Sequence, residues 1–83
     1  MIRDEIWSIS MDRILTFFNT QPDIIRTATG YQYRDCQITV QALKPKTRLG
    51  LEMAQTQVIF AGDAQSVSDI YHRFFIQFLT AGG

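Results

Sequence analysis

The stretch from residue 31 to residue 61, YQYRDCQITVQALKPKTRLGLEMAQTQVIFA, decides the fold. Apolar and polar residues alternate along most of it, and β-branched and aromatic residues are frequent, which is typical of β-strands. The pattern predicts one long antiparallel hairpin that turns over at Lys44-Pro45-Lys46-Thr47. Proline has the φ angle that type I and type II turns require, so a four-residue loop fits better than a two-residue loop.

The predicted register places Lys44 opposite Thr47. Residues that face each other across antiparallel strands share one side of the sheet, so this register gathers apolar side chains on one face. A shift by one residue would mix apolar and polar side chains. The predicted pairs are Ile38 with Met53, Val40 with Leu51, Ala42 with Leu49, Tyr33 with Val58, and Tyr31 with Phe60.

The apolar positions change from odd to even numbers near Asp35 and near Thr56. Either a bulge turns the ribbon at this level, or the base and the tip of the hairpin bury opposite faces. A turn here would instead make three strands, so we expect a bulge or a third strand near residues 54–56. A helix over residues 51–57 is a third possibility, against which Gly50 and the cross-strand pattern both argue.

Two amphipathic helices are predicted to flank the hairpin. The first covers residues 5–19, with Ser8 or Ser10 as alternative caps, although residues 6–10 also alternate as in a strand. The second starts at an Asp63 N-cap and ends at the terminal glycines. Its apolar stripe is Val67, Ile70, Tyr71, Phe74, Phe75 and Phe78. The chain is therefore predicted to be a single α+β domain, residues 1–83, with the order α-β-β-α.

Composition narrows the class of protein. The chain has 83 residues, a formal net charge of zero and one cysteine, so no intrachain disulfide can form. A lone cysteine favours a reducing compartment, and we expect a cytoplasmic protein. No apolar run approaches 18 residues and no secretory segment opens the chain, so no membrane association is expected.

The residues that most often carry chemistry are sparse. His72 is predicted to lie on the surface of the last helix and Cys36 to be a buried thiol, because a nucleophilic cysteine needs an accessible, electropositive site. One cysteine and one histidine are too few for a usual zinc site. We expect no catalytic residue, no metal site and no cofactor, and therefore no enzyme.

The hairpin is predicted to be longer than the domain that supports it. Strands of about 14 residues span about 45 Å, whereas a compact chain of this size is about 30 Å across. Apolar residues near the tip would then stay in water unless a second chain covers them. We expect a non-enzymatic interaction or regulatory module that forms a homodimer or oligomer, or binds another protein. The predicted interface residues are Ile38, Val40, Leu49, Leu51 and Met53.

Two alternative functions follow from other segments. Lys44, Lys46 and Arg48 surround Pro45 and would let a protruding ribbon enter a nucleic-acid groove, although a zero net charge argues against this. The terminal Ala81-Gly82-Gly83 is similar to the Gly-Gly tail of ubiquitin-like sulfur carriers, which implies a carrier protein. In those β-grasp proteins the tail leaves a strand, whereas here it follows a predicted helix.

Overall fold

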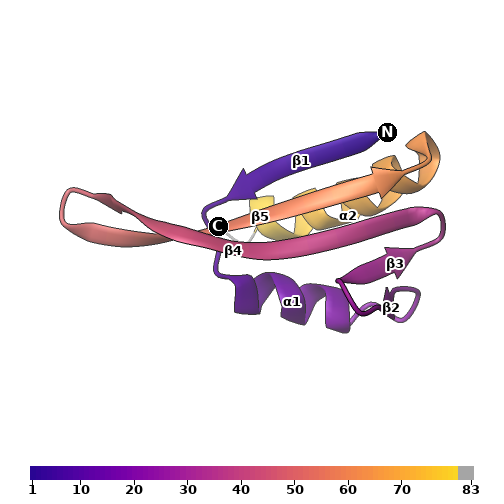
Figure 1. The fold of residues 1–83 in the computed structure, drawn as a ribbon, viewed down its shortest axis with the longest axis horizontal. Coiled ribbons are helices and arrows are strands. Elements are labelled where there is room, and N and C mark those ends of the chain that lie inside the picture. The colour runs from indigo at the N-terminus through magenta and orange to yellow at the C-terminus, as the bar shows by residue number, and fades with distance from the viewer. Residues whose placement is uncertain (81–83) are drawn as a thin grey trace.

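The structure is a computed structural model that describes residues 1–80. Within these residues, five strands form one antiparallel sheet in the order β1-β5-β4-β3-β2, and two helices lie on one of its faces (Figure 1). The elements in chain order are β1 (Ile2–Trp7), α1 (Met11–Asn19), β2 (Ile25–Arg26), β3 (Tyr31–Tyr33), β4 (Cys36–Arg48), β5 (Leu51–Gly62) and α2 (Ala64–Thr80). The α+β class is confirmed, but the α-β-β-α order is wrong because three further strands surround the hairpin.

The hairpin turns at Leu49-Gly50, not at Lys44-Pro45-Lys46-Thr47. Arg48 pairs with Leu51, and the two loop residues have φ angles of 53° and 77°. Two positive φ angles match a type I′ turn, the two-residue loop that suits the twist of a hairpin. Glycine adopts such angles without steric cost. The four-residue loop was predicted from the proline, which the structure places inside β4 instead.

Pro45 lies at a β-bulge. Leu43 pairs with Gln55 and Lys46 pairs with Met53, so Lys44 and Pro45 together oppose the single residue Ala54. A bulge leaves one residue outside the ladder, and proline, which has no N–H to donate, is tolerated there. The expected bulge near residues 54–56 is thus present opposite Ala54, but the third strand is not, because β5 runs unbroken from Leu51 to Gly62.

The turn at Leu49-Gly50 shifts the register of the hairpin, so none of the predicted residue pairs forms. Ile38 faces Phe60 and Val40 faces Val58, whereas Tyr31 faces Ile38 from β3. Tyr31 and Tyr33 form a strand of their own because the chain turns back at Arg34-Asp35, where Arg34 has a φ of 49°. This turn also explains the change of parity near Asp35.

Residues Ile2–Trp7 form strand β1, so the predicted helix over residues 5–19 is too long at its start. β1 pairs with β5 from Ile2–Ala61 to Trp7–Thr56. Its odd-numbered side chains face the helices: Glu5 accepts hydrogen bonds from the Tyr71 hydroxyl at 2.9 Å and from Trp7 Nε1 at 3.1 Å. Helix α1 begins only at Met11, after Ser10, whose side chain makes no capping bond.

Helix α2 agrees with its prediction over the described residues. Ser66 donates its backbone N–H to Asp63 Oδ1 and its hydroxyl to Asp63 Oδ2, both at 2.8 Å, as expected of an N-cap. These bonds hold the pKa of the Asp63 carboxyl below its ordinary value. Four residues of the apolar stripe, Val67, Ile70, Phe74 and Phe78, are buried, while Tyr71 and Phe75 are half-buried.

The core lies between the helices and one face of the sheet. Phe74 is fully buried at its centre, with its ring stacked on Phe18 at 5.6 Å and edge-on to Phe60 and Trp7. Phe60 of β5 thus connects the base of the hairpin to α2 through this ring contact. The buried apolar residues are Ile9, Ile14, Phe17, Phe18, Tyr31, Tyr33, Cys36, Ile38, Val58, Phe60, Val67, Ile70, Phe74 and Phe78. All of them lie outside residues 43–55.

Candidate interaction site

The outer half of the β4–β5 hairpin projects from the body as a free two-stranded arm (Figure 1). We call residues 43–55 the arm. Neither β1 nor β3 pairs with this part of the ribbon, and the molecule measures 41 Å along its longest axis against 25 and 22 Å across. Two-stranded ribbons are marginally stable in water by themselves. Within the described residues, the arm is therefore paired only along its own two strands.

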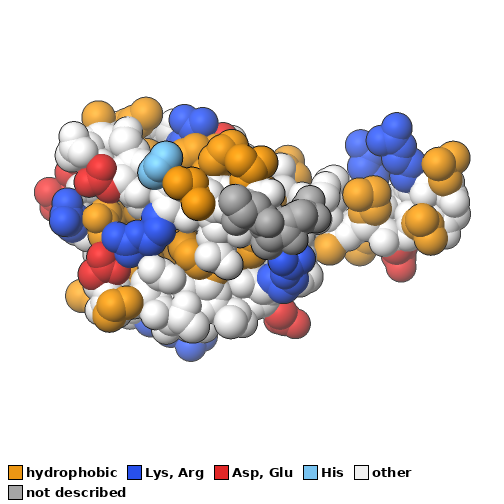
Figure 2. Space-filling model, turned by 180° about the vertical axis from the view of Figure 1, so that it is seen from behind, with side chains coloured by type: hydrophobic (Ala, Val, Ile, Leu, Met, Phe, Trp, Pro, Cys, Tyr) orange, Lys and Arg blue, Asp and Glu red, His pale blue; other side chains and the backbone are white. Residues whose placement is uncertain are grey.

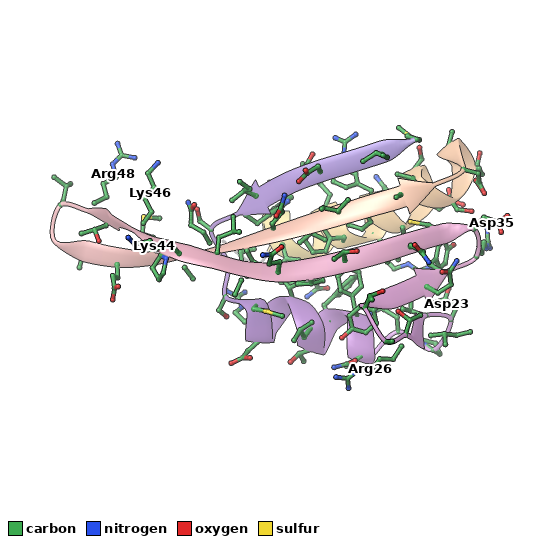
Figure 3. All side chains as sticks on the ribbon, viewed as in Figure 1. Asp23, Arg26, Asp35, Lys44, Lys46 and Arg48 are labelled. Atoms are coloured by element: carbon green, nitrogen blue, oxygen red, sulfur yellow. The ribbon has the colours of Figure 1, made fainter. Side chains whose placement is uncertain are left out.

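One face of the arm combines apolar and basic side chains. Lys46 pairs with Met53 and Arg48 with Leu51, and paired residues lie on the same side of a ribbon. Figure 3 shows Lys46 and Arg48 pointing to one side of the arm, and Figure 2 shows basic and hydrophobic side chains together on it. Leu51 is 70% exposed and Met53 is 41% exposed.

Leu49 at the tip is unfavourable for the monomer in two ways. Its side chain is 95% exposed, and its backbone adopts a positive φ of 53°. A non-glycine residue in the left-handed region costs about 1–2 kcal/mol, and the first loop position of a type I′ turn normally carries asparagine, aspartate or glycine. Strained backbone conformations of this kind cluster at active sites, ligand clamps and switch regions.

The predicted interface residues separate into two groups. Leu49, Leu51 and Met53 lie on the exposed arm, whereas Ile38 is 1% exposed and packs within the core of its own chain. Val40 is half-buried beside that core. The register of the hairpin explains this division. With the turn at Leu49-Gly50, Ile38 and Val40 face the helices, whereas the other three predicted interface residues remain in water.

The three cations predicted to bind nucleic acid all lie on the arm. Lys44, Lys46 and Arg48 are exposed (Figure 3), and no ion pair within residues 1–80 engages any of them. Three cations of the body do have carboxylate partners within the described residues: Arg3 with Glu5, Arg34 with Asp69, and Arg73 with Asp23. The arm therefore carries a net positive charge, since its three cations outnumber its one acid, Glu52.

The sheet has a second face that the helices leave open. Because Trp7, Val58 and Phe60 face the helices, their neighbours along each strand point the other way. We call this surface the open face; within the body, β1, β4 and β5 supply it with Ile2, Asp4, Ile6, Gln37, Thr39, Gln41, Gln57, Ile59 and Ala61. Figure 1 looks onto it, with α2 behind the strands. The sequence analysis missed this surface because it predicted no strand at residues 2–7.

A groove of about 400 Å³ lies between α1 and the end of α2. Its lining residues are Asp12, Arg13, Thr16, Phe17, Thr20, Gln21, Gln77 and Phe78. Among them, only the Asp12 carboxylate and the Arg13 guanidinium are charged. The two threonine hydroxyls donate to backbone carbonyls of their own helix, Thr16 to Asp12 and Thr20 to Phe17, both at 2.8 Å.

The other candidate chemical residues are engaged or isolated. Cys36 is fully buried, and burial raises the pKa of its thiol, so it is poorly suited to act as a nucleophile. His72 is exposed on α2, while its neighbour Asp69 accepts a hydrogen bond from Gln65 at 2.9 Å. Within residues 1–80, no three His, Cys, Asp or Glu side chains gather where they would hold a metal ion.

Within the described residues, neither α1 nor α2 has the length and apolarity that crossing a bilayer requires. The terminal Ala81-Gly82-Gly83, on which the carrier hypothesis rests, lies outside the described residues. Comparisons with family models, curated proteins and solved structures found no match to this chain.

Proposed function

We propose that this chain is a non-enzymatic, cytoplasmic interaction module that forms a homodimer or higher oligomer through its arm. The observation that carries the proposal is the exposed apolar arm, with Leu49, Leu51 and Met53 outside the core of their own chain. Burying a leucine or methionine side chain contributes about 1.5–3 kcal/mol, and a second chain would supply that burial.

The arm adds no residue to the buried apolar core of the described chain, which supports the same proposal. All the buried apolar residues lie outside residues 43–55, so the body has its own core without the arm. Exposed β-ribbons are prone to pairing and aggregation unless they are protected. Lys44, Lys46 and Arg48 provide some of that protection, and binding to a partner would provide the rest.

The test is the mass of the protein in solution, measured by light scattering from micromolar to millimolar concentration. We expect the wild-type mass to rise to that of a dimer or larger assembly. Leu51→Glu places a charge on the apolar side of the arm and should shift the protein toward monomer with its circular dichroism unchanged. Ala54→Glu, on the other side of the arm, is the matched control and should still associate. A monomeric wild type at every concentration would refute the proposal.

Nucleic-acid binding through the arm is the second candidate, favoured by three exposed cations that form no ion pair with any described residue. Outside residues 43–55 the chain has five basic and seven acidic residues, which would repel phosphates. Titration of fluorescent duplex DNA and RNA at about 50 mM salt tests it, since phosphate contacts are strongest at low salt. This candidate predicts weaker binding when Lys44, Lys46 and Arg48 are replaced by alanine, and it is excluded if the wild type binds neither nucleic acid.

A further inference from the structure

The open face exposes isoleucines that the fold itself does not cover. Ile2 is 73% exposed and Ile6 is 57% exposed, both on the outer strand β1. They lie beside half-buried Ile59 of β5, since Asp4 between them pairs with Ile59. Both helices pack on the opposite side of the sheet, so this apolar strip remains in water in the monomer.

The charges of this strip are opposite to those of the arm. Within the body, Asp4 is the only charged side chain that the described strands place on the open face, where it accepts a hydrogen bond from Gln57 Nε2 at 2.9 Å. The apolar side of the arm carries Lys46 and Arg48 beside Met53 and Leu51. One surface is therefore apolar and acidic and the other apolar and basic, which favours their association.

The lengths of the two surfaces also correspond. From Leu43 to the turn, the arm extends about 20 Å at about 3.3 Å per residue, and the six residues of β1 span about the same distance. An arm laid along β1 of a second copy would therefore reach both Ile2 and Ile6. If each copy offers an arm and a strip, a two-fold axis lets both contacts form at once.

We infer that the strip formed by Ile2, Asp4 and Ile6 is the receptor for the arm of a second copy of this chain. The inference rests on the proposed self-association and adds where the arm docks. Leu51 and Met53 pack on the isoleucines of the partner, and the adjacent cations of the arm face the carboxylate of Asp4. A second copy is the occupant because the two complementary surfaces are present in one chain.

A mixing experiment with two full-length variants tests the inference. Leu51→Glu blocks the arm and leaves the strip intact, whereas Ile6→Glu blocks the strip and leaves the arm intact. Each variant alone loses both reciprocal contacts, so we expect its self-association to weaken about tenfold or more relative to wild type. Mixed together, the arm of one fits the strip of the other. The mixture should therefore associate at least about tenfold more tightly than either variant alone, as measured by sedimentation and native mass spectrometry.

The outcomes separate failure of the receptor from failure of the proposed function. If wild type associates and Ile6→Glu associates equally well, the arm docks elsewhere and the receptor is refuted. If both variants are weakened but do not complement each other, reciprocal docking is refuted while self-association stands. A wild type that never associates refutes the proposed function itself. Ser68→Glu, an exposed position on α2, is the charge-matched control and should behave as wild type.

Discussion

Replacing Phe74 by alanine tests the packing of α2 on the sheet. The Phe74 side chain is fully buried, and its ring lies 5.0–6.0 Å from the rings of five other aromatic residues. Those five are Trp7, Phe17, Phe18, Phe60 and Phe78. They come from β1, α1, β5 and α2, so this one ring joins both helices to the sheet. Its removal would leave a cavity that all four elements border.

The expected loss is about 3–5 kcal/mol, which combines the lost transfer energy with the cost of the cavity. A domain of this kind has about 5–15 kcal/mol in total, so the variant should be barely folded. For a domain of about 60–100 residues, each kcal/mol corresponds to about 4–8 °C in Tm, which gives a decrease of roughly 12–40 °C. Thermal melting followed by circular dichroism, with urea titration as a second measure, provides the value.

Two neighbouring positions are controls. His72→Ala alters an exposed residue of the same helix and should change stability by no more than about 0.5 kcal/mol. Arg73→Ala removes the ion pair with Asp23, an exposed contact worth about 0–1 kcal/mol. If either control proved as damaging as Phe74→Ala, the face of α2 that packs on the sheet would be wrongly assigned.

Three further predictions concern single turns and caps. Gly62→Ala should lower stability by about 1–3 kcal/mol in urea titration, because its methyl group would meet the carbonyl oxygen of Asp35; an unchanged midpoint would contradict this close approach. Leu49→Asn should slow hydrogen exchange of the arm amides, since asparagine tolerates a positive φ, and faster exchange would argue against the type I′ turn. The Asp63 carboxylate has a lowered pKa in the folded state, so its stabilisation is present above its ordinary pKa of 3.8 and is lost as the pH falls through the folded value. Melting temperatures taken between about pH 5 and pH 2 should therefore fall less in Asp63→Asn than in wild type, whereas parallel curves would show that the bonds from Ser66 do not favour the charged form.

The sequence by itself determined α2. Its N-cap bonds join Asp63 to a residue three positions away, and its stripe follows the 3.6-residue period of the helix. Such features depend on near neighbours in the chain, so they can be predicted without knowing what the helix packs against. The burial of Cys36 and the existence of an antiparallel β4–β5 ribbon followed equally from local patterns.

The tertiary structure decided the register and the edges of the sheet. A two-residue turn at Leu49-Gly50 and a four-residue turn at Pro45 both give alternating apolar faces, and the choice rests on which face the helices cover. The dipeptide Leu49-Gly50 was the available signal for the turn. Pro45 predicted a turn at the wrong place, because proline is accepted at a β-bulge as well as in a turn. β1 exists as a strand only because β5 offers it an edge. The proposed receptor strip therefore forms only when β1 is paired with residues 49 to 59 positions away in the sequence, from Trp7 with Thr56 to Ile2 with Ala61.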